Sequence, residues 1–62
     1  MTMTRAERMR NLLSAAQDHE EAGQYDQARQ RLLLALRYAT VREKTAIRAR
    51  LAALPARRFG GA

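Results

Sequence analysis

One short segment, residues 23–28, constrains the fold of this chain more than any other feature. It reads Gly-Gln-Tyr-Asp-Gln-Ala, and apolar residues follow it at helical spacing, namely Leu32, Ala35 and Leu36. Glycine adopts the left-handed conformation that ends a helix, so we expect one helix to end just before Gly23 and another to begin near Tyr25. Because so short a connection reverses the chain direction, the segment predicts an antiparallel helical hairpin.

Two further signals mark helix N-termini. Thr4-Arg5-Ala6-Glu7 and Thr40-Val41-Arg42-Glu43 both have the spacing of a capping box, in which the threonine and glutamate side chains satisfy backbone N–H groups. Pro55 ends the last helix, since the residue before proline is pushed out of helical geometry. We therefore predict an all-α, three-helix antiparallel bundle with helices near 5–22, 25–39 and 41–54. Residues 1–55 form its single domain, and residues 56–62 a flexible tail.

The apolar residues of each predicted helix fall on one stripe, which predicts the core. The first stripe contains Ala6, Met9, Leu12, Leu13, Ala16 and His19; the second contains Tyr25, Ala28, Leu32, Ala35, Leu36 and Ala39, widened by Leu33; the third contains Ile47, Leu51 and Leu54. Leu34 and Tyr38 project on nearly the opposite side of the middle helix. Two explanations are open. Other helices of this chain contact the middle helix on two faces, or an external partner covers the second face.

The small size of the chain limits its folding stability. A single core in 62 residues leaves the free energy of unfolding near zero without an added constraint. The sequence has no cysteine and one histidine, so neither a disulfide nor a thiolate zinc site supplies that constraint. We therefore expect association with a protein partner, most simply a homo-oligomer in which Leu34, Tyr38 and the unpaired face of the third helix meet a second copy.

The charge is strongly basic. Twelve Lys and Arg stand against six Asp and Glu, a formal net charge of +6. Such a charge attracts nucleic acid, acidic protein surfaces or anionic lipid, although arginine-rich usage also arises from a GC-rich genome without selection for function. The candidate contacts to phosphates or an acidic partner are Arg42, Lys44, Arg48, Arg50, Arg57 and Arg58. A small nucleic-acid-binding protein is thus the alternative function.

The charges are also sorted along the chain. Four carboxylates cluster around the first turn, and most of the basic residues lie at the other end of the predicted hairpin: Arg5, Arg8, Arg10, Arg37, Arg42 and Lys44. The hairpin should therefore have an acidic and a basic pole. The third helix partly reverses this by returning Arg48, Arg50, Arg57 and Arg58 toward the acidic pole, which they are placed to offset.

Residues 12–39 resemble one tetratricopeptide repeat. The positions that carry the resemblance are Gly23, Tyr25, Asp26, Ala28, Leu32, Ala35 and Leu36. The resemblance implies a protein-binding surface on the first helix, lined by Arg10, Leu13 and Gln17. The same turn, together with Ile47-Arg48-Ala49-Arg50, also resembles the microtubule-interacting and trafficking domain, a three-helix module that binds peptide helices.

Little in the sequence indicates catalysis or the binding of a metal or cofactor. His19 has Gly23 one turn later and thus no second metal ligand, so a packing role in the hairpin is the better interpretation. We predict no catalysis, no cofactor, no metal and no small-molecule substrate, because no nucleophile arrangement or phosphate-binding loop is evident. No apolar run suits a membrane span or a signal peptide, so we expect a cytoplasmic, bacterial adaptor or oligomerising subunit. In the tail, Phe59 is a candidate anchor for a partner.

Overall fold

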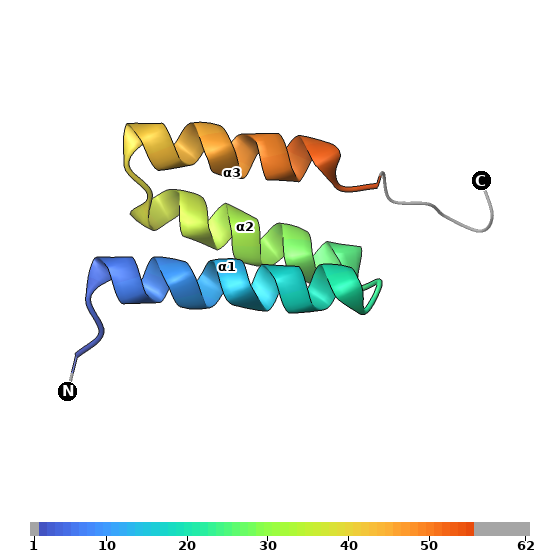
Figure 1. Ribbon diagram of the computed structural model, residues 1–62, viewed down its shortest axis with the longest axis horizontal. Helices are drawn as coiled ribbons and strands as arrows, with labels where there is room; N and C mark the ends of the chain where they lie inside the picture. Colours follow the sequence, from blue (N-terminus) through green and yellow to red (C-terminus); the bar gives the residue numbers. More distant parts are fainter. Residues whose placement is uncertain (1, 56–62) are drawn as a thin grey trace.

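The computed structural model describes residues 2–55 and contains three α-helices in that range. Helix α1 spans Arg5–Glu21, α2 spans Tyr25–Tyr38 and α3 spans Val41–Ala53, and the described residues include no strand. The helices lie side by side with α2 in the middle, and each runs antiparallel to its predecessor (Figure 1). The predicted all-α, three-helix architecture is confirmed, and the predicted helix ends agree to within one residue.

Both predicted capping boxes are present. The Thr4 hydroxyl accepts from the backbone N–H of Glu7 at 3.1 Å, and the Glu7 carboxylate accepts from the N–H of Thr4 at 2.9 Å. Thr40 and Glu43 make the same reciprocal pair at 3.2 and 2.8 Å. These bonds satisfy N–H groups that have no partner inside a helix, so they fix where α1 and α3 begin.

The hairpin turn has the geometry expected of a helix-terminating glycine. Gly23 has φ +77°, and the N–H groups of Gly23 and Gln24 donate to the carbonyls of Glu20 and His19. Nδ1 of His19 lies 2.8 Å from Oε1 of Gln24, so this side-chain pair also closes the turn. His19 is therefore part of the hairpin, as its sequence context predicts.

The core is assembled from all three helices. Its buried members are Met9, Ala16, Ala28, Leu32, Ala35, Ile47 and Leu54, with Leu32 the largest side chain that is fully enclosed. Three of these are alanines from α1 and α2, and their small side chains allow the two helix backbones to approach closely. The packing of α2 on α3 is more open, and the backbones of α1 and α3 do not come into contact.

Three predicted core positions are wrong. Leu33 is 50% exposed and Tyr25 is 39% exposed. At about 100° per residue, Leu33 lies well away from the α1-facing side of α2, and α3 packs too openly to cover it. Tyr25 is the first residue of α2 and lies beside the exposed turn. Ala6, in the first turn of α1, is likewise exposed rather than part of the buried stripe.

Candidate interaction surfaces

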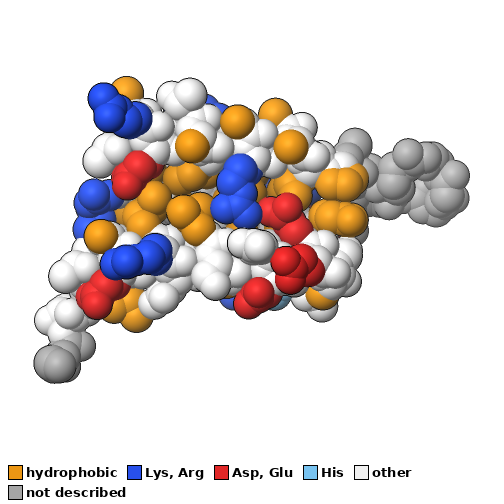
Figure 2. Space-filling view, in the orientation of Figure 1, with side chains coloured by type: hydrophobic (Ala, Val, Ile, Leu, Met, Phe, Trp, Pro, Cys, Tyr) orange, Lys and Arg blue, Asp and Glu red, His pale blue; other side chains and the backbone are white. Residues whose placement is uncertain are grey.

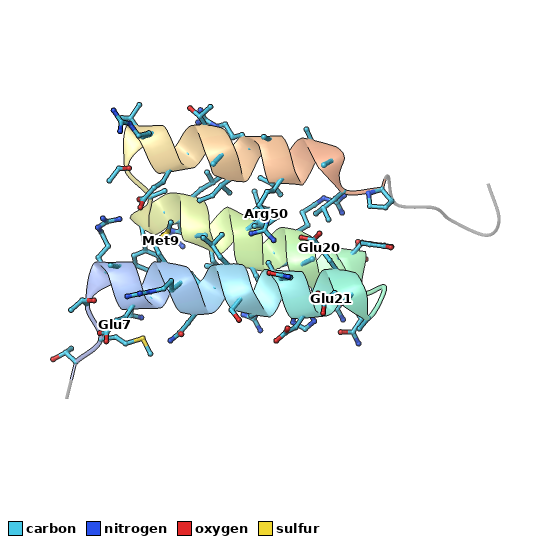
Figure 3. The ribbon with its side chains drawn as sticks, in the orientation of Figure 1. Glu7, Met9, Glu20, Glu21 and Arg50 are labelled. Carbon is cyan, nitrogen blue, oxygen red and sulfur yellow. The ribbon has the colours of Figure 1, made fainter. Side chains whose placement is uncertain are left out.

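Ionic contacts attach α3 to the hairpin near both of its ends. Nη2 of Arg50 lies 3.1 Å from the Glu20 carboxylate on α1, and Figure 3 shows the Arg50 side chain directed from α3 toward Glu20. Near the same end, Arg29 of α2 donates to the carbonyl of Pro55 at 3.3 Å. The prediction that the third helix brings Arg50 back to the acidic end is confirmed. Its guanidinium therefore has a carboxylate partner within the fold.

At the opposite end, Arg5 joins all three helices. Its Nη1 donates to the carbonyl of Tyr38, the last residue of α2, and lies 3.2 Å from the Glu43 carboxylate in the first turn of α3. The bond from the Thr40 N–H lowers the pKa of Glu43 below its usual value, and Arg5 adds to this effect. The bond from the Thr4 N–H lowers the pKa of Glu7 in the same way.

The α1 residues implied by the repeat resemblance have different surroundings. Arg10 and Gln17 are exposed, and Gln17 donates a hydrogen bond to Glu21 at 3.3 Å. Leu13 is half-buried and packs against the core. Two polar side chains are therefore available to solvent on α1, while Leu13 is held by the fold.

Leu34 and Tyr38, which the sequence pattern groups as one patch, also differ. Tyr38 packs against the core, and the guanidinium carbon of Arg8 lies 5.5 Å from its ring centroid. Leu34 is half-buried but is not among the apolar side chains packed on the central cluster of the described residues. The position of α2 between two helices accounts for Tyr38, and Leu34 remains the candidate that the core does not hold.

The outward side of α3 is a surface that the sequence pattern did not single out. Ala46, Ala49 and Ala53 are exposed and are spaced three and four residues apart, so they share one helix face. Val41, at the start of the helix, is 82% exposed. Figure 2 shows hydrophobic side chains scattered along the edge of the molecule that α3 forms. The alanine spacing is visible in the sequence, but which side of α3 faces outward is not.

The remaining predicted contacts divide into two groups. Arg42 and Arg48 are exposed and Lys44 is half-buried, and these three cations have no carboxylate partner among residues 2–55. Arg57, Arg58 and Phe59 lie outside the described residues.

Within 2–55, no group of His, Cys, Asp and Glu is arranged to hold a metal ion. None of α1, α2 and α3 has both the length and the apolarity needed to cross a bilayer.

Comparison of the chain with protein-family models, with curated proteins and with solved structures finds no match. The geometry thus defines the class of the protein as a small, all-α, three-helix domain.

Proposed function

We propose that the chain is a non-enzymatic interaction module that associates through the outward side of α3, first of all with a second copy of itself. The observation that carries this proposal is the one-sided packing of α3. Within the described residues, the backbone of α3 contacts α2 alone, and α3 reaches α1 through two ion pairs. The helix and its C-cap contribute only Ile47 and Leu54 to the buried core.

The exposed alanines support a helix as the occupant of this surface. Between α1 and α2, the close contact is built on the buried alanines Ala16, Ala28 and Ala35. Ala46, Ala49 and Ala53 offer the same small side chains to solvent on α3. A helix from another chain can approach this face as closely as α1 approaches α2.

Charge favours an antiparallel arrangement of two α3 helices. Arg42 precedes the alanines on the same helix face. In a parallel pair the two Arg42 side chains would meet, with a cost in like-charge repulsion. An antiparallel pair related by a two-fold axis places each Arg42 near the C-terminal half of the other α3, away from its counterpart.

The size of the chain and its resemblance to a repeat unit support the same conclusion. A hairpin of the tetratricopeptide type buries too little surface alone, and about three repeats are needed for a stable stack. The present fold has one hairpin and one additional helix in residues 2–55. Association through α3 adds the second layer of helices that a single copy lacks.

Sedimentation velocity over about 1–100 µM tests this proposal, in the range where weak dimers dissociate. The wild-type chain should shift from monomer to dimer, and Ala49→Glu should remain monomeric at every concentration. Glutamate is a strong helix former, so this change introduces a charge without weakening α3 itself. The matched control is Ala6→Glu, the same substitution at an exposed position of α1. A monomeric wild type, or equal association of both variants, contradicts the proposal.

A further inference from the structure

The excess positive charge of the described chain lies at one end of the molecule. At the end where α1 and α3 begin and α2 ends, residues 2–10 and 37–44 contain six Lys and Arg but only two carboxylates, Glu7 and Glu43. Residues 11–36 and 45–55 contain four of each sign and are neutral overall. Figure 2 shows basic side chains at the first end and the larger acidic group toward the other.

Internal pairing sharpens this asymmetry. At the turn end, Arg50 pairs with Glu20 at 3.1 Å and Arg29 with Asp26 at 3.5 Å. Two of the four carboxylates of the predicted acidic pole, Glu20 and Asp26, therefore pair with cations inside the fold, which reduces the attraction of this pole for the basic pole of a second copy.

At the opposite end, most of the cations form no salt bridge within the described residues. The Glu43 carboxylate pairs with Arg5, and the Glu7 carboxylate accepts the capping hydrogen bond from the Thr4 N–H. Five cations form no salt bridge with a carboxylate of residues 2–55, although the pKa of Glu7, lowered mainly by the Thr4 N–H, is lowered further by the nearby Arg10. We call these five the basic end: Arg8, Arg10, Arg37, Arg42 and Lys44. They come from all three helices, whose axes are spaced about 8–10 Å apart in ordinary packing, so the charge spreads across the whole end.

We infer that the basic end binds the phosphate backbone of duplex nucleic acid without reading its sequence. Four of the five cations are arginines, whose planar guanidinium matches phosphate in a bidentate manner. The positive ends of the α1 and α3 dipoles lie at this end against the single negative end of α2, so the helix dipoles together favour an anion there. This inference does not depend on association through α3.

The other polyanions fit this surface less well. Single-stranded nucleic acid needs exposed aromatic rings for stacking, and the aromatic residue at this end, Tyr38, is half-buried beneath Arg8. A membrane-surface site needs large apolar side chains beside the cations. The larger exposed apolar side chains at this end are Val41, at the start of α3, and Met3, just before α1. The backbones of α1 and α3 do not come into contact, so these two side chains stand on separate helix ends. A protein partner likewise needs an apolar centre to its interface.

The test is a fluorescence-anisotropy titration of a labelled 20-base-pair DNA duplex at several salt concentrations between about 50 and 200 mM. Five phosphate contacts predict that the affinity falls by about 500-fold over this range. The variant Arg10→Gln/Arg37→Gln removes two contacts and should reduce that fall to about 40-fold, with weaker binding at the lowest salt. Arg57 and Arg58 are retained in every variant.

The matched control is Arg31→Gln/Arg48→Gln. These two arginines are also exposed and also lack a carboxylate partner within residues 2–55, but they lie near the middle of α2 and α3. The control has the same net charge as the test variant and should keep the wild-type affinity and salt dependence. An equal loss in both variants would contradict the inference, because general charge rather than the basic end would then govern binding.

Parallel titrations identify the polyanion. Binding to the duplex that is tighter than binding to a single strand of equal length, to polyglutamate and to vesicles of phosphatidylserine and phosphatidylcholine supports the inference. Tighter binding to any of these three competitors overturns it. Absence of duplex binding at about 50 mM salt also overturns it, since electrostatic attraction is strongest there.

Discussion

The α1–α2 hairpin and helix α3 are stabilised in different ways. The hairpin has a glycine-terminated turn, closely packed alanines and the fully buried Leu32. Helix α3 packs on α2 more openly, and its connections to α1 are the ion pairs of Glu43 with Arg5 and of Arg50 with Glu20. Exposed or half-exposed ion pairs contribute little to the free energy of unfolding. The comparison indicates that α3 is the element most dependent on further contacts.

The largest effect is expected from truncating Leu32, the centre of the hairpin. Leu32→Ala removes a side chain with 0% exposure and should lower the free energy of unfolding by about 2–5 kcal/mol. Its neighbour Leu33 is 50% exposed, and Leu33→Ala should cost less than about 1 kcal/mol. Urea titration followed by circular dichroism measures both. Similar losses at the two positions would show that the hairpin does not have the packing described.

A smaller and more local effect is expected at Ile47, the buried residue within α3. Ile47→Ala should cost about 2 kcal/mol, at the low end for such truncations because α3 packs openly on α2. Hydrogen exchange should show lost protection in α3, with most of the protection in α1 and α2 retained. Arg48→Ala, an exposed change on the same helix, is the control. Uniform loss of protection across all three helices would remove the distinction between hairpin and α3.

The next largest loss of stability is expected from substitutions at Gly23, in the turn of the hairpin. Gly23 has φ +77°, and a Cβ built there meets no atom within 4 Å, so Gly23→Ala should cost only backbone strain. That strain is about 1 kcal/mol. Gly23→Asn should cost less, because asparagine visits the left-handed region more readily. Thermal denaturation of the two variants provides the measurement, and equal stability of Gly23→Ala and wild type would contradict the turn geometry.

The smallest effect concerns acid pH and the two capping boxes. Folding lowers the pKa of Glu7 and of Glu43 through hydrogen bonds from the N–H groups of Thr4 and Thr40. Each carboxylate therefore contributes stability that is present above about pH 4.5 and is lost as the pH falls through its lowered pKa. In Glu7→Gln/Glu43→Gln the capping hydrogen bonds can persist, but this part of the pH dependence should disappear.

Melting temperatures between about pH 7 and pH 2 measure this effect, because the range brackets the ordinary titration of glutamate. Glu21→Gln, an exposed change in the last turn of α1, serves as the control and leaves both capping boxes intact. If the double variant and Glu21→Gln show the same acid-induced change as wild type, then the capping carboxylates do not contribute to acid sensitivity.

Much of the fold was predictable because its signals are local. Thr4 with Glu7 and Thr40 with Glu43 are three residues apart, and Gly23 acts through its own backbone, so each fixes a helix end without reference to other helices. The position of Leu33 depends on how far α1 and α3 extend around α2. That is a tertiary property, and the helical period alone assigned Leu33 wrongly to the core.

The candidate surfaces were less predictable for the same reason. The spacing of charges along the chain correctly predicted that Arg50 returns to the acidic end. It did not reveal that Arg5 joins the end of α2 to the start of α3, because this contact depends on the relative height of three helices. The outward direction of Ala46, Ala49 and Ala53 likewise became clear only once the packed side of α3 was known.

The most direct test of the central claim is hydrogen exchange of the wild-type chain at two protein concentrations about a hundredfold apart, since association stabilises by mass action. The account predicts that amides of α3 become more protected at the higher concentration, while the hairpin changes less. Identical α3 protection at both concentrations, with a monomeric mass throughout, would show that α3 needs no partner and would contradict the account.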